Sequence, residues 1–387
     1  MSDDKKLKRK IDKAKRRIGR FWSAFVILAA VAIICCLTWQ SRLWNFQSID
    51  EQLAAIEAAR AIPDAENAAV YYTRFLTDPN NTSALDDLSS YTPSAYVEPW
   101  DSSEHPELAA KLKKNRAFIQ TLLDISEMQE ARFPVYPDPN SGSFMLADVR
   151  KITFILSWAA ANDLAEGRID AAYSKYRCQL KLAHHLEQQP AAYYRYVGIA
   201  IEAVASGNIR RAVMRDDITP EQLRSLKTIL EIPRNQDEKD AEIADRVNQL
   251  IEEKERSELS FAARLKQWLL GYTSRRQREQ RQRLICLRLD ATRRATPILI
   301  ALRRHKEQIG AWPEMLEQIE PKLPEQMIID PQNNGPFVYK RDGDDFVFYS
   351  KGPNNIDEGG SHSGTADDWP IWPLNLRITK QENANDK

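Results

Sequence analysis

Residues that commonly do chemistry are sparse in this sequence, and they are not spaced for catalysis. The five histidines are His105, His184, His185, His305 and His362. His184 and His185 are adjacent, so on a helix they would point about 100° apart and could not chelate a metal as an i, i+4 pair does. The H-E-x-x-H, G-x-S-x-G and P-loop motifs are absent, and with 13 glycines dinucleotide-binding loops are scarce. We therefore expect a protein that is not an enzyme, with no catalytic or cofactor-binding residues.

The four cysteines lie in two contrasting settings. Cys35 and Cys36 sit in an apolar stretch after Ile34, where lipoprotein processing would need a small residue, so two buried cysteines of an apolar helix are the favoured interpretation. Cys178 and Cys286 are far apart in the chain. They would pair in an oxidising compartment or remain free, and the sequence does not decide between these alternatives.

The N-terminus combines a basic cluster with an apolar stretch. Residues 1–20 carry ten Lys and Arg against three Asp, and residues 21–39 contain no charge. As a helix, 21–39 would reach ~28 Å, close to the ~30 Å hydrocarbon core of a bilayer. A cleaved signal peptide would instead need a shorter apolar stretch and a small-x-small site. We expect an uncleaved signal-anchor and a single-pass protein of the bacterial cytoplasmic (inner) membrane, with the lipid bilayer as a partner.

Charge also sets the predicted orientation and excludes one class of partner. The basic cluster precedes the apolar stretch, which predicts that the N-terminus stays in the cytoplasm and that residues 40–387 are periplasmic. The chain has no net charge and residues 1–20 carry +7, so the remainder carries −7. A mildly acidic body argues against a nucleic-acid partner.

The strongest helical pattern covers residues 144–215. Gly167 is expected to separate two helices with complementary apolar faces, Pro190 to open a third, and Thr219-Pro220-Glu221-Gln222 to cap a fourth. The run Gly167, Ala172, Tyr176 resembles one unit of a tetratricopeptide repeat, without a second copy at the expected spacing of about 34 residues. We predict a helical-repeat-like body, residues 40–286, that binds another protein.

Residues 261–272 form an amphipathic patch that is followed by several arginines. Its apolar side carries Phe261, Leu265, Trp268, Leu269 and Tyr272. A helix on an anionic membrane surface and a helical hairpin packed on the body both fit this pattern, and the second is favoured because long charged helices commonly pack in this way.

The C-terminal region, residues 287–387, has a different pattern. A long helix runs to Gly310, an Asp330-Pro331 step follows, and two apolar runs flank a turn at 341–344 that predicts a β-hairpin. The order of these motifs over 290–370 resembles the C-terminal half of the type II secretion major pseudopilin, a type IV pilin-like protein. More loosely, most of the chain resembles uncharacterised bacterial membrane proteins with helical middles.

The pseudopilin resemblance implies a structural calcium ion in the loop after the hairpin. By position, the backbone around Lys351 would supply carbonyl ligands, and Asn354, Asp357, Asp367 and Asp368 would supply side-chain ligands. Calcium takes six to eight oxygen ligands, which such a loop can offer. A polar loop closed by Asx turns is the alternative. The loop departs from the family pattern, since it is one residue longer and has Asn354 where an Asp is usual.

The N-terminal segment also departs from the pilin pattern. Gly19 is followed by Arg20 instead of Phe, and residues 21–39 contain no acidic residue. A filament subunit is therefore not expected.

The sequence thus predicts a mainly α protein in four parts. These are a basic cytoplasmic tail (1–20), a transmembrane helix (21–39), a tetratricopeptide-like helical body (40–286) and a small α+β pilin-like tail (287–387). The expected function is a membrane-anchored extracytoplasmic scaffold or protein-binding module. The alternatives are an accessory component of a type II secretion or pilus-like system and, least favoured, an extracytoplasmic enzyme.

Overall fold

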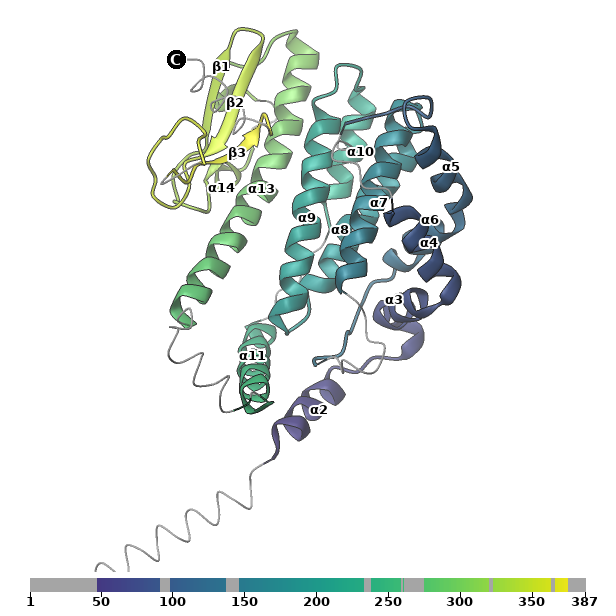
Figure 1. Ribbon diagram of the computed structural model, residues 1–387. Helices are drawn as coiled ribbons and strands as arrows, with labels where there is room; N and C mark the ends of the chain where they lie inside the picture. Colours follow the sequence, from purple (N-terminus) through teal and green to yellow (C-terminus); the bar gives the residue numbers. More distant parts are fainter. Residues whose placement is uncertain are drawn as a thin grey trace, which may run out of the picture. The chain divides into compact units, whose positions relative to one another are not determined.

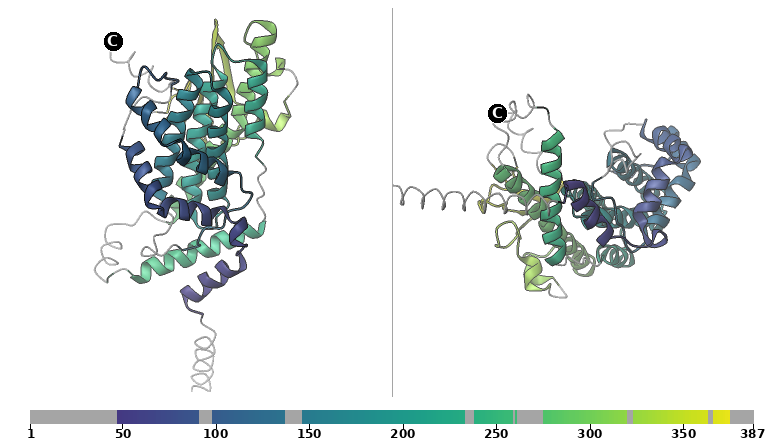
Figure 2. Two further views of the ribbon diagram at one scale, coloured as in Figure 1. Left: turned by 90° about the vertical axis from the view of Figure 1, so that its right-hand side faces the viewer. Right: turned by 90° about the horizontal axis from the view of Figure 1, so that it is seen from below.

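The computed structural model describes residues 47–90, 98–136, 146–232, 238–258, 260, 275–319, 323–362 and 366–374 (Figures 1 and 2). The chain falls into two compact units, Met1–Ala55 and Ile56–Lys387. The described part of the first unit is the start of helix α2 (Ile49–Ala59) and the two residues before it. All later elements belong to the second unit.

Four short helices open the second unit after the 3-10 turn η1 (Asp64–Glu66). They are α3 (Ala68–Thr77), α4 (Pro79–Ser89), α5 (Pro106–Lys114) and α6 (Arg116–Ser126). Asn67 caps α3 by accepting a hydrogen bond from the backbone of Ala69. Asp78 likewise accepts from Asn80 at 2.8 Å, with Pro79 at the first helical position. Asp78 and Pro79 are thus the N-cap and the first residue of α4.

Long helices form the centre of the second unit. They are α7 (Leu146–Ala165), α8 (Ile169–Glu187) and α9 (Ala192–Val213), followed by α10 (Pro220–Leu230), and they lie side by side in Figures 1 and 2. Gly167 separates α7 from α8 at φ 74°, a conformation that glycine adopts without strain. Thr219 and Gln222 form the expected capping box of α10. The predicted boundaries at Gly167 and Thr219 are confirmed.

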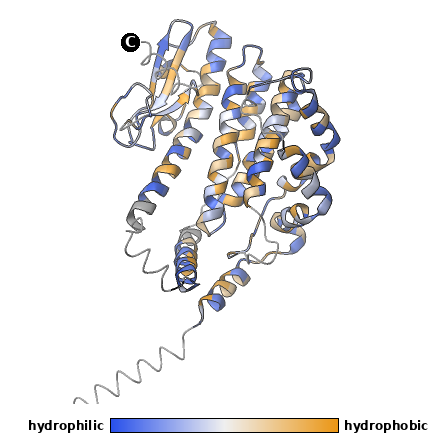
Figure 3. Cartoon of the chain, viewed as in Figure 1, coloured by the Kyte–Doolittle hydropathy of each residue, from blue (hydrophilic) through white to orange (hydrophobic). Residues whose placement is uncertain are grey.

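Helices α8 and α9 approach closely because position 198 is a glycine. A Cβ atom on Gly198 would lie 2.7 Å from the carbonyl oxygen of Ala183, too close for any other residue. Figure 3 colours many residues of both helices as hydrophobic, and Leu180 of α8 and Ala205 and Ile209 of α9 belong to one buried core cluster. The core therefore lies between the long helices.

Two further helices follow, α11 (Glu238–Glu258) and the long α13 (Arg275–Ile309), which ends at Gly310 with φ 84°. Helix α13 packs against α9. The amphipathic patch at 261–272 lies outside the described residues, so its two interpretations stay open. The 3-10 turn η2 (Leu316–Gln318) and the short α14 (Glu325–Ile328) lead into the sheet.

The sheet has three antiparallel strands in the order β1 (Val338–Asp342), β2 (Asp345–Ser350) and β3 (Trp369–Trp372). The predicted hairpin is confirmed, with Asp342 opposite Asp345 and Gly343 at positive φ in the turn. Strand β3 was not predicted. Phe346, Phe348 and Ile371 join the same core cluster as the apolar side of α13.

The predicted transmembrane architecture must be corrected. The basic segment 1–20 and the apolar segment 21–39 lie outside the described residues. Within the part of the chain that the structure describes, no helix is long and apolar enough to cross a membrane. The longest, α13, carries arginines along its length, and burying them in hydrocarbon would be costly. The observed fold is mainly helical with a small antiparallel sheet. The predicted single-pass signal-anchor and the inner-membrane location both required a membrane-spanning helix. None is found in the part of the chain that the structure describes, so neither prediction is carried forward.

Candidate metal centre and binding cavity

The loop between β2 and β3 is held at its start by the Asp330-Pro331 step. The buried Asp330 carboxylate accepts hydrogen bonds from the backbone of Gln332 at 2.9 Å and from Asn333 Nδ2 at 2.8 Å. Gln332 Nε2 in turn donates to Ser350 Oγ, and Asn333 Nδ2 to the Gly352 carbonyl. Burial raises the pKa of Asp330, although these hydrogen bonds oppose the shift. The step thus fixes where the loop begins.

Three carboxylates meet within this loop. Glu358, Asp367 and Asp368 each place a carboxylate oxygen within 4.8 Å of the others. Asp368 is fully buried, and its Oδ2 accepts from the backbone of Glu358 at 2.9 Å and of Gly360 at 2.7 Å. Within the described residues, Oδ1 of Asp367 and Oδ1 of Asp368 are buried and have no hydrogen-bond partner. Two acceptor oxygens of these aspartates therefore lack a donor.

The electrostatics of this cluster suit a hard cation. Burial raises the pKa of Asp367 and of Asp368, and the charge of Glu358 adds to both shifts. Packed carboxylates repel one another unless they are protonated or share a positive ion. Oxygen-only ligation with flexible geometry is what calcium prefers. The residues present therefore fit the ion that the pseudopilin resemblance implies.

The structure groups the predicted ligands only in part. Asp367 and Asp368 lie together, and Glu358, which was not predicted, completes the cluster. The side chain of Asn354 donates to Glu358 Oε1 and accepts from the backbone of Ile356, which closes an Asx turn. Lys351 is half-buried directly after β2.

Asp357 points to different partners. Its carboxylate accepts from Tyr349 Oη at 2.6 Å and from Lys340 Nζ at 2.9 Å, and these contacts lower the pKa of Asp357 to about 2. Asp357 therefore ties the loop to the hairpin and lies outside the acidic cluster. The Gly-rich loop marked the region, but the sequence did not show which of two successive acids turns inward.

A cavity of about 890 Å³ lies on the helical body, which we call the α8 cavity. Side chains from α8 and from the segment after α6 give it a basic wall, and the ends of α2, α10 and α11 supply apolar groups. Its basic and imidazole residues are Arg60, Arg132, Arg177, Lys181, His184 and His185. Its apolar residues include Ile62, Met128, Ile229, Ile232 and Ile243. This volume falls in the range of ligand-binding clefts.

One carboxylate orders part of the basic wall. Glu127 accepts two hydrogen bonds from Arg177, at 2.8 and 3.0 Å, and one from Lys181 at 2.7 Å. These contacts lower the pKa of Glu127. Two cations share one carboxylate, so Arg177 and Lys181 together keep one surplus positive charge. Glu130 and Glu231 also line the cavity, and Glu130 pairs with Arg132 at 2.8 Å.

His185 lines the same cavity as a neutral side chain. Its Nε2 lies 3.0 Å from the Met128 carbonyl, and its Nδ1 lies 3.4 Å from the Tyr72 hydroxyl. Burial lowers the pKa of His185 to about 4. At neutral pH it therefore contributes packing and hydrogen bonds to the wall, with no charge.

The wall is held rigid by two buried amides. Asn67 donates to the Arg132 carbonyl at 3.2 Å and accepts from the Arg132 backbone at 2.8 Å. Gln189 donates to the Ala131 carbonyl at 2.9 Å and accepts from the Phe133 backbone at 3.2 Å. The backbone of the segment that carries Arg132 therefore forms hydrogen bonds with Asn67 and with Gln189.

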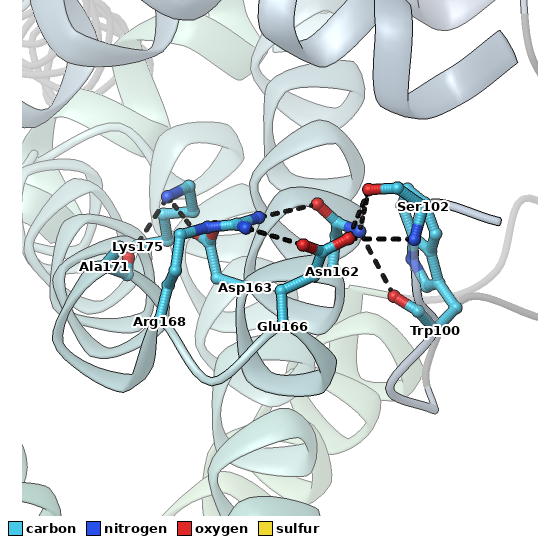
Figure 4. Close-up of polar contacts among 8 residues, drawn as sticks. All are labelled: Trp100, Ser102, Asn162, Asp163, Glu166, Arg168, Ala171 and Lys175. Carbon is cyan, nitrogen blue, oxygen red and sulfur yellow. Dashed lines mark hydrogen bonds and ion pairs between the residues drawn. The ribbon is translucent and has the colours of Figure 1, made fainter. Parts of the chain in front are cut away.

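A separate polar network closes the turn between α7 and α8 (Figure 4). Asp163 binds Lys175 Nζ at 2.5 Å and Arg168 Nε at 2.7 Å, both within the helix pair. Glu166 accepts from Ser102, and Asn162 donates to the Trp100 carbonyl at 3.2 Å. The charges are matched internally, so we assign this network to fixing the segment around residue 100 on the helix pair.

The two described cysteines are both free. The alternative in which Cys178 pairs with Cys286 is therefore wrong for this structure. Cys178 is buried, and burial raises its pKa to about 12, so the thiol is unreactive.

Comparisons with known proteins found no relative of this chain. No family model matches the chain, and no curated protein or solved structure is significantly similar to it.

Proposed function

We propose that this chain is a non-catalytic binding module that holds a segment of another protein in the α8 cavity. The observation that carries this function is the cavity's composition, in which a basic wall faces apolar groups supplied by separate elements. A segment with acidic side chains on one side and apolar side chains on the other complements both walls. Burial of its apolar side would supply affinity, while the basic wall would set orientation and speed of association.

The rigidity of the wall supports the same proposal. A surface held in its binding conformation before the partner arrives loses less conformational entropy on binding. Asn67 and Gln189 hold the segment that carries Arg132, and Glu127 holds Arg177 and Lys181. The cationic groups are thus already positioned around the cavity.

Site-specific crosslinking tests this function. A photoreactive amino acid at Thr228, an exposed residue of the cavity, should crosslink one defined protein in cells. The same amino acid at Thr121, which is exposed on α6 and does not line the cavity, should not. Replacing Arg132 and Lys181 by alanine should abolish the crosslink from Thr228, whereas Lys113→Ala on α5 should leave it intact. Equal crosslinking from Thr228 and Thr121 would contradict the proposal.

The identity of the crosslinked protein separates the two non-enzymatic alternatives. A secretion ATPase or a secretin would favour an accessory role in a type II secretion or pilus-like system. Any other partner would favour a scaffold outside that machinery.

We propose in addition that calcium binds at Glu358, Asp367 and Asp368 and has a structural role. The bound ion would offset the mutual repulsion of the three carboxylates. It could also be coordinated by Oδ1 of Asp367 and Oδ1 of Asp368, which have no hydrogen-bond donor among the described residues. Extracellular calcium modules bind with dissociation constants of about 10⁻⁴–10⁻³ M. An ion at ~100 times its dissociation constant stabilises the folded state by roughly 2.7 kcal/mol.

Thermal unfolding of the full chain tests the calcium site. The midpoint should be higher in 10 mM calcium (~100 times the tighter constant above) than in chelator, and magnesium should raise it less because it requires a tight octahedral cage. Asp368→Asn should remove the calcium response. Asp357→Asn is the matched control, because that carboxylate binds Lys340 and Tyr349 and should alter stability without altering the response. Identical midpoints with and without calcium would leave only a polar loop.

A further inference from the structure

A second cavity, of about 610 Å³, lies against the C-terminal half of α9, and we call it the α9 cavity. Asn208, Arg211 and Arg215 line it from one helix face and the residues just after it, at spacings of three and four residues. Tyr176 of α8 and Trp372 at the end of β3 also line it. Neither this cavity nor its residues belong to the metal centre or to the α8 cavity.

The guanidinium groups of this cavity have carboxylate partners that are mostly in solvent. Arg211 Nε lies 3.3 Å from Glu98, whose side chain is 72% exposed, whereas the Arg211 side chain is 24% exposed. Arg215 binds Asp217 at 2.5 Å, and the Asp217 side chain is 67% exposed. The pair with Glu98 is long and its carboxylate is exposed, so an incoming anion can replace it at small cost. Arg215 holds Asp217 through two hydrogen bonds, at 2.8 and 2.5 Å, so an anion would share this guanidinium group with Asp217.

Arg210 precedes Arg211 in α9 and carries a third positive charge, although it does not line the cavity. It is buried and donates to the backbone carbonyls of Ser206 at 3.1 Å and Ile371 at 2.9 Å. Among the described residues it has no carboxylate partner. Burial, with a further contribution from Arg211, lowers the pKa of Arg210 to about 9. Burial likewise lowers the pKa of Arg211, and Glu98 opposes that shift only in part.

At this end of α9, Arg210 is buried and Arg211 and Arg215 are half-buried. The acidic residues near them, Glu98, Asp216 and Asp217, are exposed. Buried charge is costly unless it is paired. An anion inside the cavity would stabilise the arginines more than the solvated carboxylates at the rim do. The rest of the lining includes the apolar Leu164, Ala161 and Trp372. The polar Ser157 and the exposed Asp216 also line the cavity.

We propose that the α9 cavity binds an organic anion, in which a carboxylate or phosphate group is joined to an apolar body. The anionic group lies between Arg211 and Arg215, and both guanidinium groups can donate paired hydrogen bonds to it. The apolar body lies against Leu164 and Trp372. Glu98 occupies the position of the anion in the free protein and is displaced when the ligand binds.

Titration of the full chain with four probes tests this site. The probes are benzoate, phenyl phosphate, inorganic phosphate and the neutral benzyl alcohol, followed by calorimetry or ligand-detected NMR. Saturable binding of benzoate or phenyl phosphate, with weaker binding of inorganic phosphate and benzyl alcohol, is expected. Preference between the first two identifies the anionic group.

Three variants make the assignment specific. Arg211→Gln and Arg215→Gln should each weaken binding about tenfold, equivalent to ~1.4 kcal/mol. Arg224→Gln, an exposed arginine of α10, should leave binding unchanged. Glu98→Gln should strengthen binding, because the competing internal carboxylate is removed.

Two results would overturn the proposal. One is the absence of saturable binding of both aromatic anions at millimolar concentration. The other is binding that is insensitive to Arg211→Gln, Arg215→Gln and Glu98→Gln. A loss of stability in Arg211→Gln alone does not mimic the expected pattern, because Glu98→Gln must act in the opposite direction.

Discussion

Arg293 joins three helices, and its replacement by methionine should destabilise the protein strongly. From α13 it donates to Glu202 of α9 at 2.8 and 2.5 Å and forms a short ion pair with Glu187 at the end of α8. The side chains of Arg293, Glu187 and Glu202 are 22%, 14% and 3% exposed. Burial disfavours the charge of Arg293, but the two carboxylates outweigh it and raise its pKa.

The magnitude follows from what the substitution leaves behind. Arg293→Met keeps the apolar stem but leaves two carboxylates in the interior without their shared cation. Breaking a buried pair on one side costs about 3–5 kcal/mol. At ~2–4 °C for each kcal/mol, even the lower figure predicts a fall in the unfolding midpoint of roughly 6–12 °C. Arg224→Met, at an exposed position of α10, should change it by less than about 2 °C, since such surface changes stay within ~0.5 kcal/mol.

The same reasoning predicts that two further substitutions restore the stability of the Arg293→Met variant, and that its loss of stability depends on pH. Arg293→Met combined with Glu187→Gln and Glu202→Gln should recover most of the lost stability, because neutral amides then replace the two buried carboxylates that shared the cation. In the single variant a buried carboxyl should keep its proton to a higher pH than in the unfolded chain, where glutamate titrates near ~4.3. The folded state then binds more protons, so the deficit should shrink as pH falls from 7 to 5. Denaturant unfolding of all four proteins is the assay. A midpoint for Arg293→Met equal to that of Arg224→Met, or no rescue by the two amides, would refute the argument.

Two further predictions concern the α8 cavity and the acidic loop. The pKa of His185 is about 4 in the folded chain and 6.5 as its ordinary value, so the unfolded chain binds the proton more readily. The free energy of unfolding should therefore fall by about 3 kcal/mol between pH 6.5 and 4. His185→Gln should flatten that part of the stability curve in denaturant titrations, and an unchanged slope would contradict the assignment. Gly352→Ala should destabilise the fold and remove the calcium response, because φ is 66° and the new Cβ would lie 2.4 Å from both the carbonyl and Oδ1 of Asp367. Gly343→Ala, also at positive φ but with open space around it, should cost only ~1–2 kcal/mol in thermal unfolding and keep the response.

Local signals in the sequence predicted the helix ends well. Gly167, Gly310 and the Thr219 capping box act through nearest neighbours, so their effect is the same in the sequence and in the folded chain. The Asp78-Pro79 step is ambiguous at this local level. A cap residue followed by proline satisfies both a turn and a helix start, and only packing of the following residues selects α4.

Strand β3 was missed because its signal is short. It consists of four residues with Pro370 inside, a composition that argues against a strand unless the strand lies at an edge. Its pairing with Tyr349 and Ser350 depends on a return across the whole acidic loop. Such long-range pairing leaves no local trace in the sequence.

The sequence predicted the loop that holds the acidic cluster, but not all of the residues that form the cluster. Asp357 and Glu358 are adjacent, and only the hydrogen bonds from Tyr349 and Lys340 decide that Asp357 turns toward the hairpin. Both cavities were invisible in the sequence, because their walls come from segments that are far apart in the chain. Arg210 lies near the end of α9, and its contact with the Ile371 carbonyl depends on the packing of β3 beside that helix.

Strand β3 connects the acidic cluster to the α9 cavity. Asp368 directly precedes the strand, and Trp372 at the strand's other end lines the cavity. Within this short span, Trp369 Nε1 donates to Thr292 of α13, and the Ile371 carbonyl accepts from Arg210 of α9. The strand therefore cannot shift without breaking contacts to two helices of the body. A cation that orders Asp368 would act on the same strand that forms one wall of the α9 cavity, and any coupling between the two sites must be equal in both directions.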